Sequence, residues 1–227
     1  MCGRYSLLTP MKALQRLFGC VVSAINFPPR YNIAPSQFAP VVALHEDHAA
    51  NLSLMRWGLM PAWSTSNNNQ YSMFNARAET VATKLAYRDA FKKRRCLVPA
   101  DGFYEWKKQG SIREPYRISL INENVFAFAG LWERQENGSS SVTDSFTILT
   151  TPANSVISPI HARMPLILPP EVHTDWLSGF EPEALLSPYP AAKMNIYPLD
   201  SYVNNARYDD PRCLTPAKRS GQADFFN

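Results

Sequence analysis

The first residues of the chain, MCGRY, place a cysteine directly after the initiator methionine. A small residue at this position permits enzymatic removal of Met1, which would leave Cys2 with a free α-amine beside its thiol. The reference pKa is about 7.7–8.0 for an α-amine and about 8.5 for a thiol, so both nucleophiles are partly available near neutral pH. An interior cysteine offers only the thiol. The alternative is that Cys2 packs as an ordinary small apolar residue.

Three further segments carry polar residues in surroundings rich in aromatic residues and proline. FNARAET places Asn75, Arg77 and Glu79 at alternating positions, and SPIHARMP places His161 before an apolar run. GFYEWKK places Glu105 between two aromatic residues. If this segment is a strand, Glu105 points to the opposite face from both neighbours. Each residue alone is also compatible with a solvent-facing or structural role.

The composition is that of a globular protein with a hydrophobic core. The 227 residues are 45% hydrophobic and 19% charged, with a net charge of +4. The four cysteines are widely spaced without a CxxC pair, which argues against a disulfide framework or a zinc knuckle and fits a reducing compartment. No apolar run reaches membrane-spanning length, and we recognise no signal peptide. The mild positive charge is compatible with a polyanionic partner.

Basic residues concentrate between Lys84 and Arg95, where six of them are opposed only by Asp89. Lys84, Arg88 and Lys92 are four residues apart, so on a helix they would share one face. Such a run most often forms a solvated surface. The more specific interpretation is a groove that follows a phosphate backbone.

The first half of the chain shows one well-marked helix. Thr9 is the expected N-cap, Pro10 the first helical residue and Gly19 the end. The expected apolar stripe consists of Met11, Leu14, Leu17 and Phe18. The pattern of residues 39–57 predicts two strands joined by a polar turn. His45 and His48 lie in that turn, and without a third ligand nearby we expect an exposed turn and no metal site. A second helix is predicted over residues 79–92.

The second half is rich in short strand patterns separated by turn signals, which favour antiparallel neighbours. The predicted strands are 96–100, 102–108, 115–121, 125–133 and 144–151, and short helices are predicted at 169–178 and 181–187. Together these elements predict one α+β domain, with a curved, mostly antiparallel, barrel-like sheet and flanking helices. We expect the domain to occupy residues 1–216 and residues 217–227 to form a flexible tail.

Six ordered blocks closely resemble one known family. MCGRY, YNIAPSQ, WGLMPAW, FNARAET, RRCLVPADGFYEWK and HARMP are similar to motifs of the SOS response-associated peptidase (SRAP) family. The resemblance runs from Cys2 to about Pro216. Members of this family process abasic sites in DNA. The resemblance therefore implies the family's β-rich, barrel-like domain and a role in the DNA damage response.

The resemblance also implies a set of active-site residues. Cys2, exposed by loss of Met1, matches the covalent nucleophile, and Asn75, Glu105 and His161 match the other active-site positions. The family name records a proposed self-processing peptidase activity that would release Met1. Neither a cofactor nor a metal ion is expected.

The partner implied by the resemblance is single-stranded or junction DNA that contains an abasic site. The predicted DNA contacts are Arg4, Arg77, Arg88, Arg163, Trp57 and Trp106. Three of the arginines match basic positions of the family's DNA groove, and WGLMPAW matches a loop that supports the site and helps to part the strands. No base-reading motif is evident, so we expect contacts that fix position without reading sequence. We expect a monomer without membrane association, in the bacterial cytoplasm with the nucleoid or in a eukaryotic nucleus.

An abasic deoxyribose is in equilibrium with an open aldehyde, which an amine–thiol pair captures well. The Cys2 amine would form an imine with C1′, and the thiol would then close a thiazolidine ring. A group that titrates near neutrality, such as His161, suits protonation of the ring oxygen during sugar opening. Glu105 suits the proton transfers at the amine and imine, and Asn75 can orient the sugar or the amine through hydrogen bonds.

Two other functions remain as alternatives. Glutamine amidotransferases with an N-terminal nucleophile also begin with MCG and use the same free amine as a base. However, we find none of their glutamine-binding or oxyanion motifs, and no synthase domain to use the ammonia. The other alternative is a noncovalent nucleic-acid-binding module in which Cys2 is incidental. A mass gain on abasic DNA would separate the first function from both.

Overall fold

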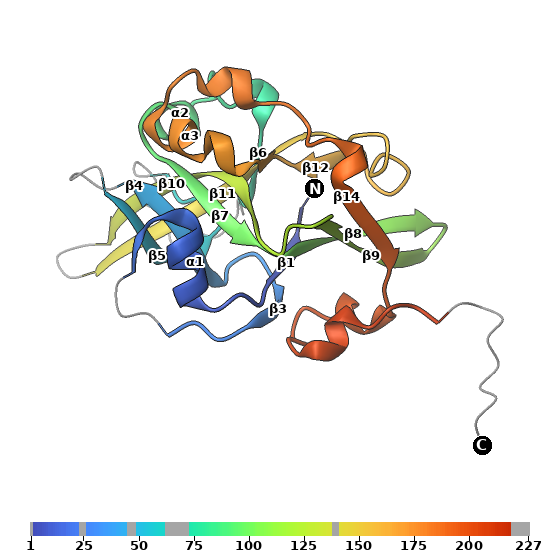
Figure 1. The fold of residues 1–227 in the computed structure, drawn as a ribbon. Helices are drawn as coiled ribbons and strands as arrows, with labels where there is room; N and C mark the ends of the chain where they lie inside the picture. Colours follow the sequence, from blue (N-terminus) through green and yellow to red (C-terminus); the bar gives the residue numbers. More distant parts are fainter. Residues whose placement is uncertain (1, 23–25, 45–48, 62–72, 138–140, 219–227) are drawn as a thin grey trace.

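The structure is a computed structural model, and it describes residues 2–22, 26–44, 49–61, 73–137 and 141–218. Most of these residues belong to strands, which form two sheets joined along the start of the chain (Figure 1). The predicted single α+β domain, with a mostly antiparallel, barrel-like core and flanking helices, is confirmed. His45, His48 and residues 219–227 of the predicted tail lie outside the described residues.

The smaller sheet has five strands, and every neighbouring pair in it is antiparallel. Its order is β14 (Met194–Pro198), β9 (Ile112–Leu120), β8 (Gly102–Gln109), β1 (Arg4–Leu7) and β3 (Arg30–Ile33). The β8–β9 hairpin arises from a segment in which aromatic and β-branched residues alternate with charged ones, which is the pattern of a half-buried strand. This sheet carries the start of the chain between β8 and β3.

The larger sheet closes on itself. Its order is β12 (Arg163–Pro165), β11 (Ser141–Pro152), β10 (Phe126–Asn137), β7 (Arg95–Ala100), β4 (Phe38–Leu44), β5 (Ala50–Trp57) and β2 (Val21–Val22). β11 also pairs in parallel with β5, so the circuit from β11 through β10, β7, β4 and β5 returns to β11. Two short strands join this sheet, β6 (Asn75–Arg77) beside β11 and β13 (Ile167–Leu168) beside β10.

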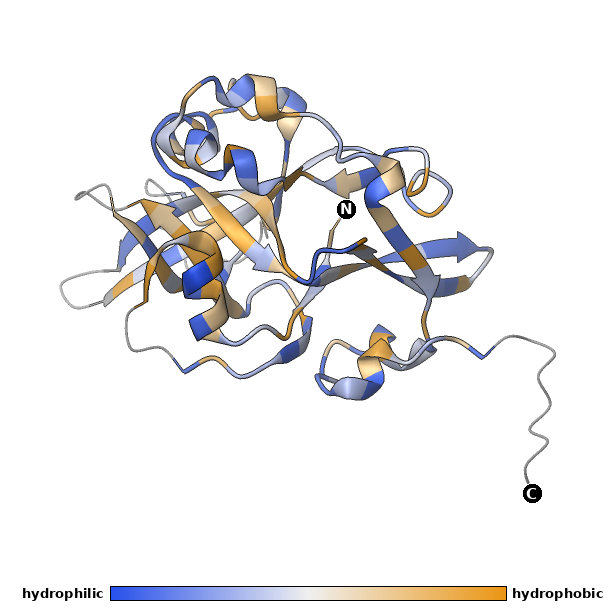
Figure 2. Cartoon of the chain, in the orientation of Figure 1, coloured by the Kyte–Doolittle hydropathy of each residue, from blue (hydrophilic) through white to orange (hydrophobic). Residues whose placement is uncertain are grey.

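The core fills the closed circuit and the junction between the two sheets. β7 is buried along its whole length, as expected for a central strand, and Figure 2 shows hydrophobic residues concentrated along it and its neighbours. Tyr5 of β1 packs edge-on against Trp57 and Phe128, with ring centroids 5.2 and 5.8 Å apart. These aromatic contacts fix β1, and with it the start of the chain, against the barrel.

Helices are short and lie at the rim, where α2 and α3 sit together over one end of the barrel (Figure 1). The α-helices are α1 (Met11–Phe18), α2 (Arg88–Lys93) and α3 (His173–Ser178). The single-turn 3-10 helices are η1 (Ala78–Thr80), η2 (Pro170–Val172), η3 (Pro182–Leu185), η4 (Ala191–Lys193), η5 (Ser201–Asn204) and η6 (Pro211–Leu214).

The strand predictions are confirmed, whereas two helix predictions need correction. The helix predicted over 79–92 is wrong: η1 and a turn precede α2, so Lys84 lies outside the helix that carries Arg88 and Lys92. α1 begins one residue later than predicted, with Pro10 at the N-cap position in place of Thr9, and Gly19 ends it in the left-handed conformation. Leu17 of the predicted stripe is 62% exposed. Within the residues that the structure describes, no helix is long and apolar enough to cross a membrane.

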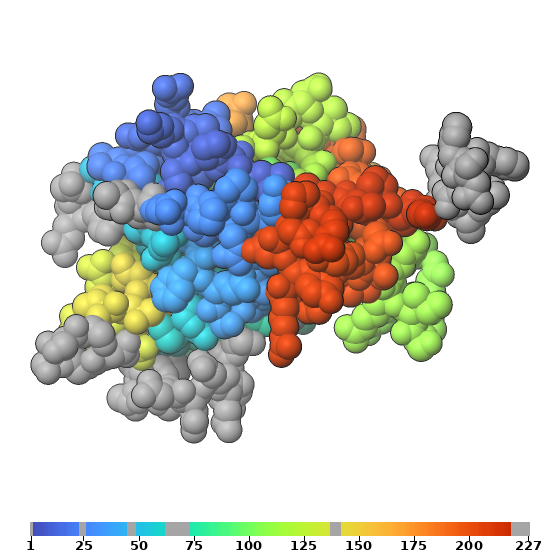
Figure 3. All heavy atoms as spheres, turned by 90° about the horizontal axis from the view of Figure 1, so that it is seen from below, coloured from blue at the N-terminus to red at the C-terminus, as the bar shows by residue number. Residues whose placement is uncertain are grey.

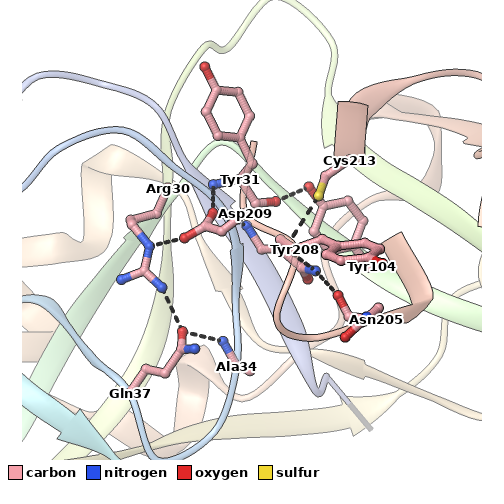
Figure 4. A network of polar contacts seen from close by, with 10 residues as sticks. Arg30, Tyr31, Ala34, Gln37, Tyr104, Asn205, Tyr208, Asp209 and Cys213 are labelled. Atoms are coloured by element: carbon pink, nitrogen blue, oxygen red, sulfur yellow. Dashed lines mark hydrogen bonds and ion pairs between the residues drawn. The ribbon is translucent and has the colours of Figure 1, made fainter. Parts of the chain in front are cut away.

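The C-terminal segment, residues 199–217, folds back against β3 and β8. Figure 3 shows it (red) lying against the residues around β3 (blue), and Figure 4 shows the polar network that holds it. Asp209 accepts hydrogen bonds from the backbone N–H groups of Tyr31 and Asn32, at 2.6 and 2.9 Å, and pairs with the Arg30 guanidinium. The Asn32 side chain donates to the carbonyl of Tyr208 at 2.9 Å and to two further carbonyls of the segment.

Loss of the Asp209 carboxylate is expected to destabilise the fold. In Asp209→Ala, two backbone donors of β3 and the Arg30 guanidinium lose their acceptor, and we expect a cost of about 2 kcal/mol in the free energy of unfolding. Urea unfolding measures this change. Asp89→Ala is the matched control, since Asp89 is exposed and makes only a 3.6 Å ion pair. Equal unfolding free energies for the two variants would contradict the role given to the network.

Candidate active site

Pairing of β1 with β8 brings Glu105 close to Cys2. Arg4 lies opposite Tyr104, so Glu105 comes next to the residues that precede β1. The Cys2 side chain is completely buried, and its Sγ lies 3.9 Å from the carbonyl oxygen of Arg4. Burial, reinforced by the negative charge of Glu105, strongly raises the pKa of the Cys2 thiol. In this environment the thiol keeps its proton at neutral pH.

Asn75, on the larger sheet, contacts Cys2. It is the first residue of β6, which pairs in parallel with β11 and places Asn75 opposite Ile148. Its Nδ2 donates a 2.7 Å hydrogen bond to the carbonyl oxygen of Cys2. Its Oδ1 is buried and has no hydrogen-bond partner among the described residues. Asn75 therefore holds the backbone of Cys2 and presents an acceptor for a donor that is not part of the described fold.

Glu105 is a buried carboxyl group, only 3% exposed. Burial raises its pKa, and the positive charge that His161 can carry opposes this shift. A carboxyl with a raised pKa can hold and release a proton closer to neutral pH than an ordinary glutamate. This is the property required of a group that moves protons during imine chemistry.

His161 lies in the turn before β12. Its Nδ1 is 3.0 Å from both the backbone nitrogen and the carbonyl oxygen of Arg163, so either tautomer has a partner there. The charge of His161 acts on Glu105, which in turn acts on Cys2. Figure 1 shows the start of β1 directed toward β6, which begins with Asn75, and toward β12, which begins two residues after His161. The structure thus brings together the four predicted catalytic residues from four separate segments.

Two of the predicted DNA contacts, Arg77 and Arg163, lie beside these residues. Arg77 ends β6 and is exposed to solvent. Arg163 begins β12, and its guanidinium forms two hydrogen bonds with the Glu79 carboxylate. Arg88, a third predicted contact, is exposed on α2 and 3.6 Å from Asp89. The sequence analysis noted the alternation of Asn75, Arg77 and Glu79 but did not find the Arg163–Glu79 pair.

Arg4 and Trp106 are engaged within the protein. The Arg4 guanidinium donates to the carbonyl oxygens of Val203 and Asn204, at 2.7 and 2.9 Å, and lies 4.8 Å from the centre of the Trp106 ring. The Trp106 Nε1 donates a 2.6 Å bond to Oδ1 of Asn204. Trp106 alternates with Glu105 along β8, so it faces the C-terminal segment, on the other side of the sheet from Glu105. Both side chains therefore lie against the C-terminal segment, and their contact with DNA stays a prediction.

Trp57 is completely buried, which argues against the predicted direct contact with DNA. Its ring stacks on Phe146 with centroids 6.2 Å apart, and its Nε1 donates a 2.9 Å hydrogen bond to the carbonyl of Phe74. Phe74 directly precedes Asn75, so the indole supports the strand that carries Asn75. The WGLMPAW motif predicted such support, although only residues 57–61 of the motif are described.

Comparison with known proteins assigns the chain to a family. The family model described as SOS response associated peptidase (SRAP) matches residues 1–206. The chain belongs to this family. Two SRAP relatives carry names that refer to DNA lesions. The chain is 36% identical to the abasic site processing protein YoqW of Bacillus subtilis, over 94% of this chain and 99% of the relative. It is 31% identical to the abasic site processing protein HMCES of Xenopus tropicalis, over 83% and 66%.

The SRAP fold is also present among solved structures. A crystal structure of a protein from Bacteroides thetaiotaomicron matches 96% of this chain and all of that chain, with a TM-score of 0.87 and 25% identity. A crystal structure from Bordetella bronchiseptica, 24% identical, has a TM-score of 0.74 and shows the fold alone. Membership of the SRAP family favours abasic-site processing over the glutamine amidotransferase alternative. Among the described residues, no group of three potential metal ligands lies together.

Proposed function

We propose that this chain captures abasic sites in single-stranded DNA by forming a thiazolidine between Cys2 and the open deoxyribose, after Met1 has been removed. The observation that carries this proposal is the hydrogen bond from Asn75 to the Cys2 carbonyl. The charge of Glu105 also acts on the Cys2 thiol, and the charge of His161 acts on Glu105. The names of the relatives, abasic site processing proteins, agree with it. The adduct would shield the lesion and keep the strand intact.

The reaction balances without an oxidant or a cofactor. The neutral α-amine of Cys2 attacks C1′ of the open aldehyde, a C–N bond forms, and the carbonyl oxygen leaves as water. The S–H group then adds across the C=N bond, so sulfur bonds to C1′ and a proton ends on nitrogen. The sum is protein plus DNA minus one water. Ring closure also removes the imine, through which β-elimination would otherwise break the strand.

The electrostatics of the site support this order of events. Burial and Glu105 keep the Cys2 thiol protonated, so the amine is the first nucleophile and the thiol acts second. Glu105 accepts a proton from the amine or the thiol and returns one during dehydration, which its raised pKa favours. The unpartnered Oδ1 of Asn75 can accept a hydrogen bond from the substrate or from the α-amine. Sugar opening precedes these steps, and His161 promotes it by protonating the ring oxygen.

Contacts with DNA in this proposal go mainly to the phosphate backbone. Arg77 and Arg88 are exposed on the segments next to Asn75, and Tyr87 links this region to the site through a 3.4 Å hydrogen bond to the Asn75 carbonyl. Such contacts hold a strand without reading its sequence. The substrate would be a single strand or a junction, bound by a monomer in the bacterial nucleoid or a eukaryotic nucleus. Release of Met1, by an aminopeptidase or by the SRAP site itself, precedes capture.

The test is adduct formation on a single-stranded oligonucleotide that carries one abasic site, with the same oligonucleotide lacking the lesion as control. We expect a band of reduced mobility on a denaturing gel that survives heating and appears only with the lesion. A complex that dissociates on denaturation would support the noncovalent binding module instead. Release of ammonia from glutamine without any adduct would support the amidotransferase.

A further inference from the structure

The guanidinium of Arg163 is held at its outer edge by a carboxylate. Arg163 Nη1 and Nη2 donate to the two oxygens of Glu79, at 2.5 and 3.0 Å. The Arg163 side chain is 16% exposed, whereas that of Glu79 is 44% exposed. The pair is therefore a two-point fork in which the arginine is anchored and the glutamate faces solvent.

The inner edge of the same guanidinium is fixed by the barrel. Arg163 Nη2 also donates to the carbonyl oxygen and to Oγ1 of Thr150, at 2.5 and 3.1 Å. Thr150 is a buried residue of β11, opposite β12 in the larger sheet. These bonds orient the arginine without Glu79, so the guanidinium would keep its direction if the carboxylate moved away.

The Arg163–Glu79 pair lies at the margin of the candidate active site. Glu79 belongs to η1, which follows directly on the strand that begins with Asn75. The backbone nitrogen of Arg163 contacts the His161 ring. The hydrogen bonds from Arg163, followed by its charge and that of Arg77, lower the pKa of Glu79, so this carboxylate is ionised at neutral pH.

We propose that Glu79 occupies the phosphate-binding edge of Arg163 in the free protein and gives way to a DNA phosphate when a strand binds. This inference rests on the proposed function, and it assigns to Glu79 a restraint on DNA affinity. The planar guanidinium fork fits a carboxylate and a phosphate in the same two-point geometry, so one can replace the other. The Glu79 side chain is 44% exposed, so a phosphate can approach the fork from solvent and compete with the carboxylate for the same donors.

The consequence concerns undamaged DNA. Each strand that binds must displace Glu79, so the carboxylate lowers affinity for every strand that lacks a lesion. A lesion-bearing strand is retained by the covalent bond to Cys2, so its capture does not depend on this noncovalent affinity. Glu79 is therefore a specificity-determining residue that leaves capture possible while limiting occupation of intact single strands.

The experiment compares Glu79→Gln with Glu136→Gln, an equal change of charge at an exposed residue at the far end of β10. The affinity of each variant for an undamaged single-stranded oligonucleotide is measured by fluorescence anisotropy at fixed salt. We expect Glu79→Gln to tighten binding several-fold more than Glu136→Gln. In an Arg163→Ala background, the additional gain is expected to disappear, because the edge that Glu79 covers is no longer there. If Arg163→Ala does not fold, Arg163→Lys keeps the charge and removes the fork.

Three results would overturn the inference: equal gains in the two glutamine variants, a gain that persists without the Arg163 fork, or weaker binding by Glu79→Gln. The last would mean that Glu79 holds Arg163 in place for DNA. Adduct formation by the unchanged protein is followed in parallel on the abasic oligonucleotide. Binding without any adduct would contradict the proposed function alone, whereas no binding to DNA at all would overturn both.

Discussion

Replacing Cys2 by serine is expected to abolish the heat-stable adduct with abasic DNA. The variant keeps the α-amine, so it still forms an imine with C1′, but a hydroxyl does not close the ring as a thiol does. The imine is labile, and borohydride should trap it as a stable amine. The measurement is a denaturing gel of reactions with and without borohydride, in which wild-type protein gives a band in both and Cys2→Ser only with the reductant.

Two controls locate this effect at the N-terminus. Cys20→Ser removes another buried thiol, directly after the C-cap of α1, and should leave the adduct intact. A variant with an added residue that resists removal up to Cys2 lacks the free amine and should form neither imine nor ring. If the blocked protein gave a stable adduct on abasic DNA, the thiazolidine mechanism would be wrong.

Substitution of His161 and Glu105 is expected to separate sugar opening from imine chemistry. His161→Ala should slow capture of the natural abasic site and have much less effect on a substrate that already presents an open aldehyde. Glu105→Gln should slow both substrates, because both need proton transfers at the amine and imine. Loss of one general acid or base typically costs about 10²–10⁴ in rate, which quenched time courses resolve. Equal slowing of both substrates by His161→Ala would refute its part in sugar opening.

The pH dependence of capture provides a second readout for Glu105. Glu105 must be deprotonated to accept a proton, and burial raises its pKa. The rate of wild-type capture should therefore fall as pH decreases through this raised pKa, at a higher pH than an ordinary carboxyl would produce. Glu105→Gln has no carboxyl to titrate, so this decrease should be absent in the variant. Persistence of the same decrease in Glu105→Gln would assign it to another group.

The strands could be predicted because their local patterns agree with their burial. The segments around Leu97, Glu105 and Phe128 combine β-branched and aromatic residues with nearby turn signals, and each is a strand in the structure. The helix predicted over 79–92 failed because spacing of charged residues is compatible with a helix but does not require one. Packing decides instead: Ala90 and Phe91 are buried in a helix of six residues, while Lys84 and Leu85 stay exposed before it.

The candidate site could be predicted in its composition but not in its contacts. Cys2, Asn75, Glu105 and His161 stand out by residue type, and motif order indicated that they belong together. The partners of Arg4 could not be predicted from the sequence, because its hydrogen bonds reach Val203 and Asn204, about two hundred positions along the chain. Such contacts depend on how the C-terminal segment packs on the sheet, which no local pattern records.

The intact mass of the protein, before and after incubation with an abasic single strand, tests the central claim most directly. We predict that the free protein lacks Met1 and that the product has the summed mass of protein and oligonucleotide less one water. The same oligonucleotide without the lesion should give no product. A free protein that retains Met1 and still forms the adduct, or a Met1-free protein that gains no mass from the lesion, would contradict the account.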